Sequence, residues 1–262
     1  MAKISMKNVN RLIKESKKEK SAGDTFLDDL NRFIQKSQKD REPSRSYKPS
    51  QLNCIRNAYY QMIGEKRDEG LNTPNIIGIN EIGSFRHEVI QDYIIKLCES
   101  KDKYEWIEIE DYIKEKNITD LKIIDKIGAE TKCYHKKYNL SFMTDGILKI
   151  CGEYVIFEYK TETCFKAQNR KEVDKDHYNQ AICYSLAFGI NNVLFLYENR
   201  DNCTKKFFPL KVTPLMRQSV IDKILECDSC VKNLEVPDKE EGKLCNYCKY
   251  KKACERDGDG KR

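Results

Sequence analysis

Three features of the sequence predict an α/β fold with one core and a mixed β-sheet. The chain of 262 residues is long enough for one sizeable domain with an appendage, and short for two independent domains. Two segments with helical periodicity precede a run of strand-like segments, and a further helix and two more strands follow. This order of helices and strands is typical of a single α/β core flanked by helices.

The composition favours a soluble cytosolic protein whose cysteines bind a metal or a cluster. The sequence contains no run of about 20 apolar residues, which a membrane-spanning helix needs, and its start lacks the apolar core of a secretory signal. We therefore expect no membrane contact, and twelve cysteines in a reducing compartment favour metal ligation over disulfides. The net charge of +6 is compatible with a nucleic-acid partner but does not establish one.

The chain divides into a charged arm, a core and a short tail. Residues 1–46 are rich in charged residues and Ser, with one amphipathic segment over residues 26–35. We expect an arm that is either mobile with one short helix or a contact for DNA or a partner protein. The core is expected over residues 47–256, and residues 257–262 form a flexible tail.

Two helices are predicted before the strands. Pro49 and Ser50 are a helix-start signal, which places Cys54 in the first turn of a helix. A second helix is expected to begin after Ser84 as its N-cap, with His87 in its first turn. The helix N-terminus would favour a neutral imidazole able to ligate a metal, although a buried or capping role for His87 is the alternative.

The middle of the chain carries the strand signals. Strands are predicted over residues 129–135, 140–150 and 153–162, and then, after a basic loop at 166–176 and a helix at 177–189, over 192–198 and 205–212. Only Cys151 and Gly152 separate the second and third of these strands, which predicts a β-hairpin. No phosphate-binding loop or dinucleotide fingerprint is present in the sequence, so ATP hydrolysis is not expected.

The predicted hairpin brings two acids and a lysine together. If its turn is centred between Cys151 and Gly152, Asp145 lies opposite Glu158, with Cβ atoms about 5 Å apart. Because side chains alternate along a strand, Glu158 and Lys160 point to the same face.

Two facing carboxylates in an apolar setting repel each other and are desolvated, and a divalent cation would relieve both costs. The pattern therefore predicts a Mg²⁺ or Mn²⁺ site for phosphodiester cleavage, in which Lys160 lowers the pKa of the attacking water or stabilises charge on the phosphate. Gly146 would permit a close approach of backbone or substrate. The alternative is a surface hairpin with ordinary ion pairs.

Other polar residues could belong to the same site. Gln180 and Tyr184 lie four apart on one helix face with His177, and they could contact a DNA phosphate or base, or simply pack the helix. Glu130 could supply an extra carboxylate to the metal, or be a solvated strand residue.

The ordered set His87, Asp145-Gly146, Glu158-Tyr159-Lys160 and Gln180-x3-Tyr184 resembles the RecB-like branch of the PD-(D/E)xK nucleases. The resemblance implies a restriction-endonuclease-like core in which His87, Asp145, Glu158 and the main-chain carbonyl of Tyr159 bind metal. It also implies that Lys160 assists catalysis and that Gln180 and Tyr184 hold the DNA strand. Many relatives have a glycine several residues before the first acid, whereas this chain has Thr-Asp-Gly.

Four cysteines extend the resemblance. Cys245-x2-Cys248-x5-Cys254 supplies three ligands near the end of the chain, and Cys54 resembles the single N-terminal cysteine of the iron–sulfur members of this branch, which include CRISPR-associated exonucleases and the AddB subunit. This implies a 4Fe–4S cluster that joins the N- and C-terminal segments. The rival is a zinc ribbon with Cys227-x2-Cys230 and Cys245-x2-Cys248, which would leave Cys54 and Cys254 unused.

The resemblance as a whole implies a metal-dependent DNA exonuclease that acts on single-stranded ends. A helicase, recombination or CRISPR-adaptation protein is the implied partner. Two alternatives stay open: a structure-specific endonuclease, and a module that keeps the fold and binds DNA or a partner without cleaving.

Overall fold

The structure is a computed structural model that describes residues 21–37, 44–69, 72–128 and 130–258. The chain splits into two compact units, one of residues 1–42 with 72–80 and one of residues 43–71 with 81–262. Residues 1–20 and 38–43 of the predicted arm, and residues 259–262 of the predicted tail, lie outside the described residues. Within the described part of the chain, no helix is long and apolar enough to span a membrane.

The amphipathic segment of the arm forms helix α2, Ala22–Ser37. Its N-terminus has a reciprocal cap, because the Asp24 amide donates to the Ser21 hydroxyl at 3.1 Å and the Ser21 amide donates to the Asp24 carboxylate at 3.0 Å. Phe26, Leu30 and Phe33 all lie on its exposed surface.

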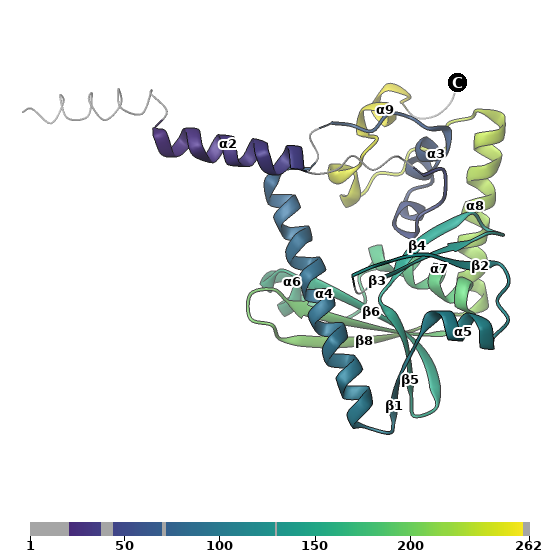
Figure 1. Cartoon of the computed structure of the whole chain (residues 1–262). Helices are drawn as coiled ribbons and strands as arrows, with labels where there is room; N and C mark the ends of the chain where they lie inside the picture. Colours follow the sequence, from purple (N-terminus) through teal and green to yellow (C-terminus); the bar gives the residue numbers. More distant parts are fainter. Residues whose placement is uncertain (1–20, 38–43, 70–71, 129, 259–262) are drawn as a thin grey trace, which may run out of the picture. The chain divides into compact units, whose positions relative to one another are not determined.

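The central sheet is mixed, as predicted, and has five strands in the order β1-β5-β6-β7-β8 (Figure 1). The strands are β1 Tyr104–Ile107, β5 Gly146–Ile150, β6 Glu153–Glu162, β7 Asn192–Asn199 and β8 Lys205–Lys211. Strands β6 and β7 are parallel, and the other neighbouring pairs are antiparallel.

A second sheet of three strands, β2-β3-β4, corrects the expectation of one continuous strand over residues 140–150. Its strands are β2 Leu121–Ile127, β3 Glu130–His135 and β4 Leu140–Thr144. The predicted strand is divided at Asp145 into β4 and β5, which belong to different sheets. The Asp145 carboxylate accepts the Tyr159 N–H at 2.6 Å, a side-chain contact that takes the place of a ladder bond where the chain passes between the sheets.

The predicted hairpin is present with the predicted register. Cys151 and Gly152 have φ values of 51° and 89°, and positive φ at both central residues of a two-residue turn suits the twist of the flanking strands. Gly146 pairs with Phe157 and Ile147 with Ile156, so Asp145 comes opposite Glu158 at the end of the ladder.

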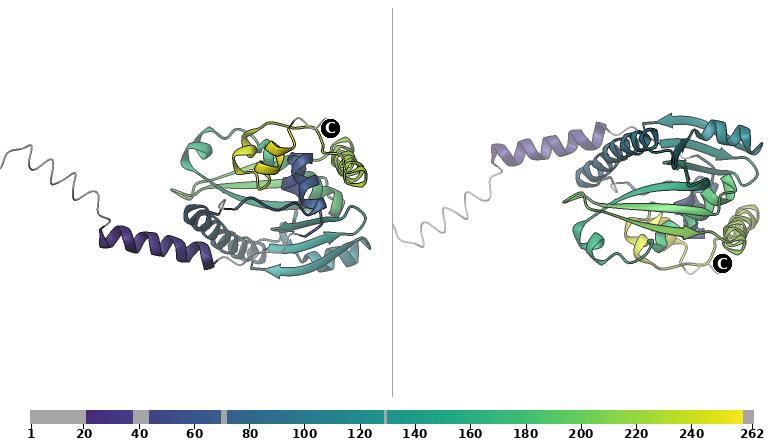
Figure 2. Two further views of the ribbon diagram at one scale, coloured as in Figure 1. Left: turned by 90° about the horizontal axis from the view of Figure 1, so that it is seen from above. Right: turned by 90° about the horizontal axis from the view of Figure 1, so that it is seen from below.

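Helices cover both faces of the five-stranded sheet (Figure 2). On one face α4, Pro74–Ser100, contributes Ile90 to a small core with Leu148, Phe157 and Tyr159. The main core lies on the other face, where α7, Tyr178–Phe188, and α8, Pro214–Asn233, pack against alternate residues of the same strands, such as Ile147 and Ile156. This alternation is the expected consequence of the pleat.

Helix α4 begins earlier than predicted, which makes Ser84 an interior residue and not an N-cap. The hydroxyl of Thr73 accepts the Ile76 N–H at 3.4 Å and Pro74 occupies the first helical position, a combination that starts helices. His87 therefore lies in the middle of α4, and the expected influence of a helix N-terminus on its imidazole does not apply.

The remaining elements are short. They are η1 Pro49–Asn53, α3 Ile55–Ile63, α5 Ile109–Glu115, α6 Cys164–Asn169, η2 Lys175–His177, η3 Lys243–Tyr247 and α9 Lys251–Arg256. Helix α6 occupies the start of the segment expected to be a basic loop, and Cys54 is the N-cap of α3 and not part of its first turn.

Candidate metal centre and cysteine pocket

Three side chains of types that can ligate a metal converge next to the start of β5. The ligand atoms of His87, Glu130 and Asp145 all lie within 4.8 Å of one another, and no other such group of three occurs in the described part of the chain. Glu130 is the first residue of β3 and was expected only as an additional carboxylate. One imidazole and two carboxylates suit a hard divalent cation such as Mg²⁺ or Mn²⁺.

His87 is oriented by packing and by Asp145. Its ring lies 4.8 Å from the Tyr159 ring in an edge-to-face arrangement, and its Nδ1 is 3.0 Å from Asp145 Oδ1 and 3.9 Å from Glu130 Oε1. Burial lowers the pKa of His87, but the hydrogen bond and charge of Asp145 outweigh it, so the pKa is raised. The carboxylates of Asp145 and Glu130 thus favour a positive charge next to His87.

Asp145 is held on both sides. One carboxylate oxygen lies against His87 and the other accepts the Tyr159 N–H, while the Gln91 side chain donates to the Asp145 carbonyl at 3.1 Å. Because Gln91 and His87 both come from α4, this helix positions the backbone as well as the carboxylate of Asp145.

Glu158 and Lys160 form the second half of the site. Lys160 Nζ is 2.5 Å from Glu158 Oε1, which confirms that the two side chains share a face of β6. Glu158 is 2% exposed, and its Oε2 atom is buried without a hydrogen-bond partner. Burial and the nearby charge of Asp145 raise the pKa of Glu158 above its usual range. Burial lowers the pKa of Lys160, but the carboxylates of Glu158 and Asp145 raise it by more, so its amine stays protonated.

Gln180 and Tyr184 lie on α7 and connect this helix to Glu158 and to the end of β4. The Gln180 amide donates to Glu158 Oε1 at 2.7 Å and to the Tyr184 hydroxyl at 2.6 Å. The Tyr184 hydroxyl in turn donates to the Met143 carbonyl. Tyr184 is 1% exposed, whereas Gln180 is partly exposed, and the expected contact of this pair with a DNA strand stays a prediction. His177, also on this side, binds Tyr197 through a contact of 2.8 Å between Nδ1 and the hydroxyl.

A buried ion pair next to His87 was not anticipated from the sequence. Arg86 binds Glu198 at the end of β7 through two hydrogen bonds of 2.9 and 3.0 Å, and the Glu198 side chain is 1% exposed. A buried carboxylate needs such a partner, and this pair fixes α4 against the sheet. A charged residue at the end of the apolar strand of residues 192–198 was the available signal.

The glycine of the Asp-Gly pair is required by packing within the protein. A Cβ atom on Gly146 would lie 2.3 Å from the Trp106 ring, which belongs to β1. The expected close approach is therefore made by an indole ring of the same chain.

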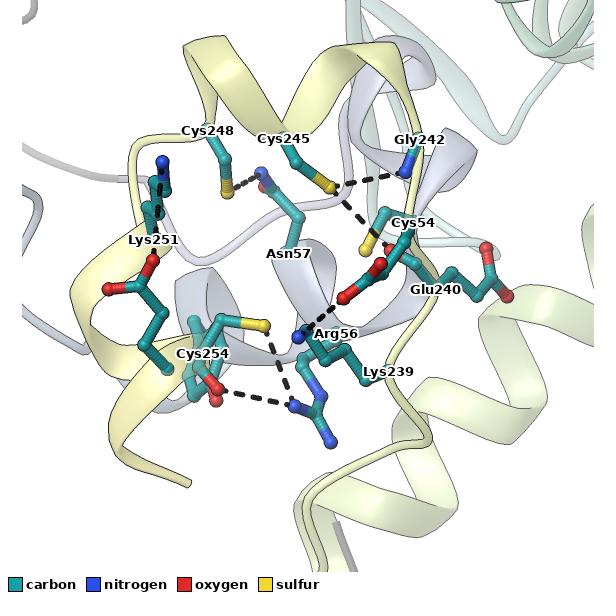
Figure 3. A pocket seen from close by; sticks show the side chains of 13 residues that line it. Cys54, Arg56, Asn57, Lys239, Glu240, Gly242, Cys245, Cys248, Lys251 and Cys254 are labelled. Atoms are coloured by element: carbon teal, nitrogen blue, oxygen red, sulfur yellow. Dashed lines mark hydrogen bonds and ion pairs between the residues drawn. The ribbon is translucent and has the colours of Figure 1, made fainter. Parts of the chain in front are cut away.

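The four cysteines of the predicted cluster line one cavity of about 260 Å³ (Figure 3). Cys54 comes from the start of α3, whereas Cys245, Cys248 and Cys254 come from the segment that contains η3 and α9. Contacts across the cavity join positions far apart in the chain, as when the Asn57 amide donates to Cys248 Sγ at 3.4 Å over 191 positions. The described residues that line it do not include Cys227 or Cys230, which lie on α8.

Several N–H groups point at the sulfur atoms. The Gly242 amide is 3.4 Å from Cys245 Sγ, and the Tyr250 amide is 3.4 Å from Cys248 Sγ. Burial raises the pKa of the Cys54 thiol, and the backbone N–H groups of Asn57 and Arg56 act in the opposite direction. N–H donors of this kind stabilise thiolates, which are the metal-binding form of cysteine. All twelve cysteines of the chain are free of disulfides, so the four in this cavity are available as ligands.

No known protein family matches the sequence, and a search of curated proteins finds no match. Solved structures similar to the chain include SSO0001, at 14% identity and a TM-score of 0.44, with 84% of this chain and 91% of that chain covered. They also include the alkaline exonuclease LHK-Exo from Laribacter hongkongensis, at 11% identity and a TM-score of 0.42, with 73% of this chain and 92% of that chain covered. The structure of LHK-Exo with dAMP matches at 11% identity and a TM-score of 0.43, with 72% of this chain and 91% of that chain covered.

Proposed function

We propose that the protein is a metal-dependent DNA nuclease that hydrolyses phosphodiester bonds from single-stranded ends. The observation that carries this proposal is the convergence of His87, Glu130 and Asp145 within 4.8 Å beside the Glu158–Lys160 pair. Hard-cation ligands next to a fixed ammonium group suit the cleavage of a phosphate diester, because both stabilise negative charge on the phosphate.

The residues fit a divalent cation of the Mg²⁺ or Mn²⁺ type. The buried Oε2 atom of Glu158 has no hydrogen-bond partner, and an unpaired buried carboxylate oxygen is costly unless a cation or a proton satisfies it. Glu158 would therefore add a ligand to the group of three, and the main-chain carbonyl of Tyr159 is a further candidate. A bound cation would polarise the phosphate and lower the pKa of a water molecule in its shell.

The chain's own residues would orient and stabilise the reacting groups. Asp145 is fixed by the Tyr159 N–H, and Glu158 is fixed by Gln180, so neither carboxylate has to reorganise when substrate binds. Lys160 remains charged at neutral pH and would stabilise the negative charge that develops on a phosphate oxygen. A charged lysine is poorly suited to act as a base, so we assign the electrostatic role to it.

The cysteine cavity is proposed to hold a 4Fe–4S cluster. Its support is the arrangement of four cysteines around one cavity with N–H donors directed at three of the sulfurs. A zinc ribbon would need Cys227 and Cys230, which are not among the described residues that line this cavity. Zinc bound by the same four cysteines is the alternative to the cluster.

The test of the nuclease is a time course on end-labelled linear and closed circular single-stranded DNA with Mg²⁺, Mn²⁺ or a chelator. We expect metal-dependent shortening of the linear DNA and intact circles. Efficient cutting of circles would instead identify an endonuclease. Metal-independent DNA binding without cleavage of either substrate would contradict the proposal and identify a non-cleaving module.

A further inference from the structure

One arginine is buried in the wall of the cysteine cavity. Arg56 lies in the first turn of α3, two residues after Cys54, and is 1% exposed. Its Nη1 atom is 3.5 Å from Cys254 Sγ and 3.4 Å from the Cys254 carbonyl (Figure 3). Its Nε atom donates to the Pro237 carbonyl at 2.7 Å, and Nη1 donates to the Gly258 carbonyl at 2.6 Å. The side chain therefore spans the segments on either side of the cavity.

Arg56 has no hydrogen-bonded carboxylate partner among the described residues. A guanidinium group is protonated at any physiological pH, and burying it is costly unless negative charge lies close by. Its hydrogen-bond acceptors among the described residues are carbonyl oxygens and the Cys254 sulfur, and its Nη2 atom is buried with no acceptor. The carboxylate of Asp257 is close enough for its charge to interact with that of Arg56, but its hydrogen bonds go to Tyr60 and Arg256. The chain thus buries a cation where four thiols are gathered.

Thiolates would supply the missing negative charge. Cysteines bind a cluster or a metal as thiolates, and four of them bring more negative charge than the metal ions neutralise. The N-cap and first turn of α3 would then provide three complementary groups: Cys54 as a ligand, Arg56 as a cation beside Cys254, and the Asn57 amide as a donor to Cys248. The positive end of a helix favours the same negative charge.

We infer that Arg56 is the charge-balancing residue of the four-cysteine site and sets the reduction potential and metal retention of the bound cluster. The inference rests on the proposed cluster. The competing role is purely structural: the hydrogen bonds of Arg56 join the backbone near Pro237 to that near Gly258, and its charge has no effect on the cluster. The two roles differ because the first depends on the positive charge and the second on the hydrogen bonds.

The test uses the full-length protein with Arg56→Gln, Arg56→Lys and a matched control, Lys251→Gln. Lys251 also lines the cavity but is half exposed and pairs with Glu255. Three quantities are measured: the midpoint reduction potential in a titration with a mediator, the rate of iron release to a chelator, and the melting temperature. One-electron reduction adds a negative charge to the site, so loss of a neighbouring cation opposes it.

We expect Arg56→Gln to shift the potential to more negative values and to release iron about 10–100-fold faster, as for other residues that support metal ligands. Arg56→Lys keeps the charge and should keep the potential near that of the wild type even though its melting temperature falls. Lys251→Gln should match the wild type in all three. If Arg56→Gln does not fold, Arg56→Lys provides the test. A reduction potential shifted away from that of the wild type in Arg56→Lys would show that the positive charge does not set the potential.

Two outcomes would reject the inference for different reasons. An unchanged potential and iron release in Arg56→Gln, with melting lowered as much as in Arg56→Lys, would show that Arg56 only holds the backbone. A wild-type protein that contains no iron would reject the cluster itself, and this role with it, while leaving the nuclease proposal to its own test on DNA.

Discussion

The two candidate sites of this protein are built in opposite ways. The hairpin site takes Asp145, Glu158 and Lys160 from neighbouring strands, and the register of one tight turn places them together. The cysteine cavity takes one ligand from the start of α3 and three from the end of the chain, and contacts such as that between Tyr60 and Ala253, 193 positions apart, hold it closed. The hairpin residues of the first site are local in sequence and are joined by His87 and Glu130 from α4 and β3, whereas the second site has no local part that is complete without the other end of the core.

The sites also differ in how their charge is handled. At the hairpin, acids crowd together with one unsatisfied carboxylate oxygen, an arrangement that leaves room for a cation from outside. Around the cysteines, N–H donors and a buried arginine already face the sulfurs. The first arrangement suits an exchangeable catalytic ion and the second a permanent structural group. This contrast predicts that damage to the hairpin reduces activity without unfolding the protein, and that damage to the cavity mainly lowers the stability of the fold.

The largest expected effect tests the hairpin. Glu158→Gln or Lys160→Met should reduce the rate of cleavage of end-labelled linear DNA by about 10²–10³-fold, the usual loss when a preorganised electrostatic group is removed. Glu153→Gln is the matched control, because Glu153 is exposed on the same strand. Variants of Glu158 or Lys160 that cut DNA as fast as the wild type would refute the assignment.

The second effect tests the cavity. Cys254→Ser should remove the iron and lower the free energy of unfolding by several kcal/mol, because ligand binding and folding are coupled in such sites. Iron analysis and thermal unfolding measure both. Cys203→Ser, at an exposed cysteine, should change neither. Cys230→Ser separates cluster from zinc ribbon, since loss of metal in this variant but not in Cys254→Ser would favour the ribbon.

A smaller effect tests what holds the hairpin in place. The Cβ atom of Gly146→Ala would meet the Trp106 ring at 2.3 Å, and overpacking of this kind costs about 1–3 kcal/mol. Gly78→Ala is the control, because nothing lies within 4 Å of a Cβ there and the residue is in a helix, where Ala is favoured over Gly by about 1 kcal/mol. Urea unfolding should separate the two variants in opposite directions, and equal stabilities would show that Trp106 moves aside freely.

The smallest effect concerns the third member of the metal group. Glu130→Gln should raise the Mg²⁺ concentration needed for half-maximal cleavage by about tenfold, as expected for loss of one charged ligand or its support. Activity at saturating metal should largely recover, unlike that of Glu158→Gln. Glu110→Gln, exposed on α5, serves as the control. An unchanged metal requirement would remove Glu130 from the site.

Much of the hairpin could be predicted from the sequence. A two-residue turn at Cys151-Gly152 and the alternation of side chains determine which residues face each other, and both are local properties. The start of α4 was misplaced because the signal at Ser84 resembled a cap, while the combination of Thr73 and Pro74 begins the helix earlier. The single strand expected over residues 140–150 is two strands, because the Asp145 side chain replaces a ladder contact and the chain changes sheets there.

Local sequence patterns were enough to predict the α/β class, the strands around the acids, the face shared by Glu158 and Lys160, and the cysteines to compare. The packing of distant segments brings Glu130 to His87 and Asp145, buries Tyr184, pairs Arg86 with Glu198, and places Cys54 opposite the C-terminal cysteines. The physical reason is that periodicity and turn chemistry act over a few residues. Burial and charge pairing depend on which distant segments pack together, and no local pattern encodes that.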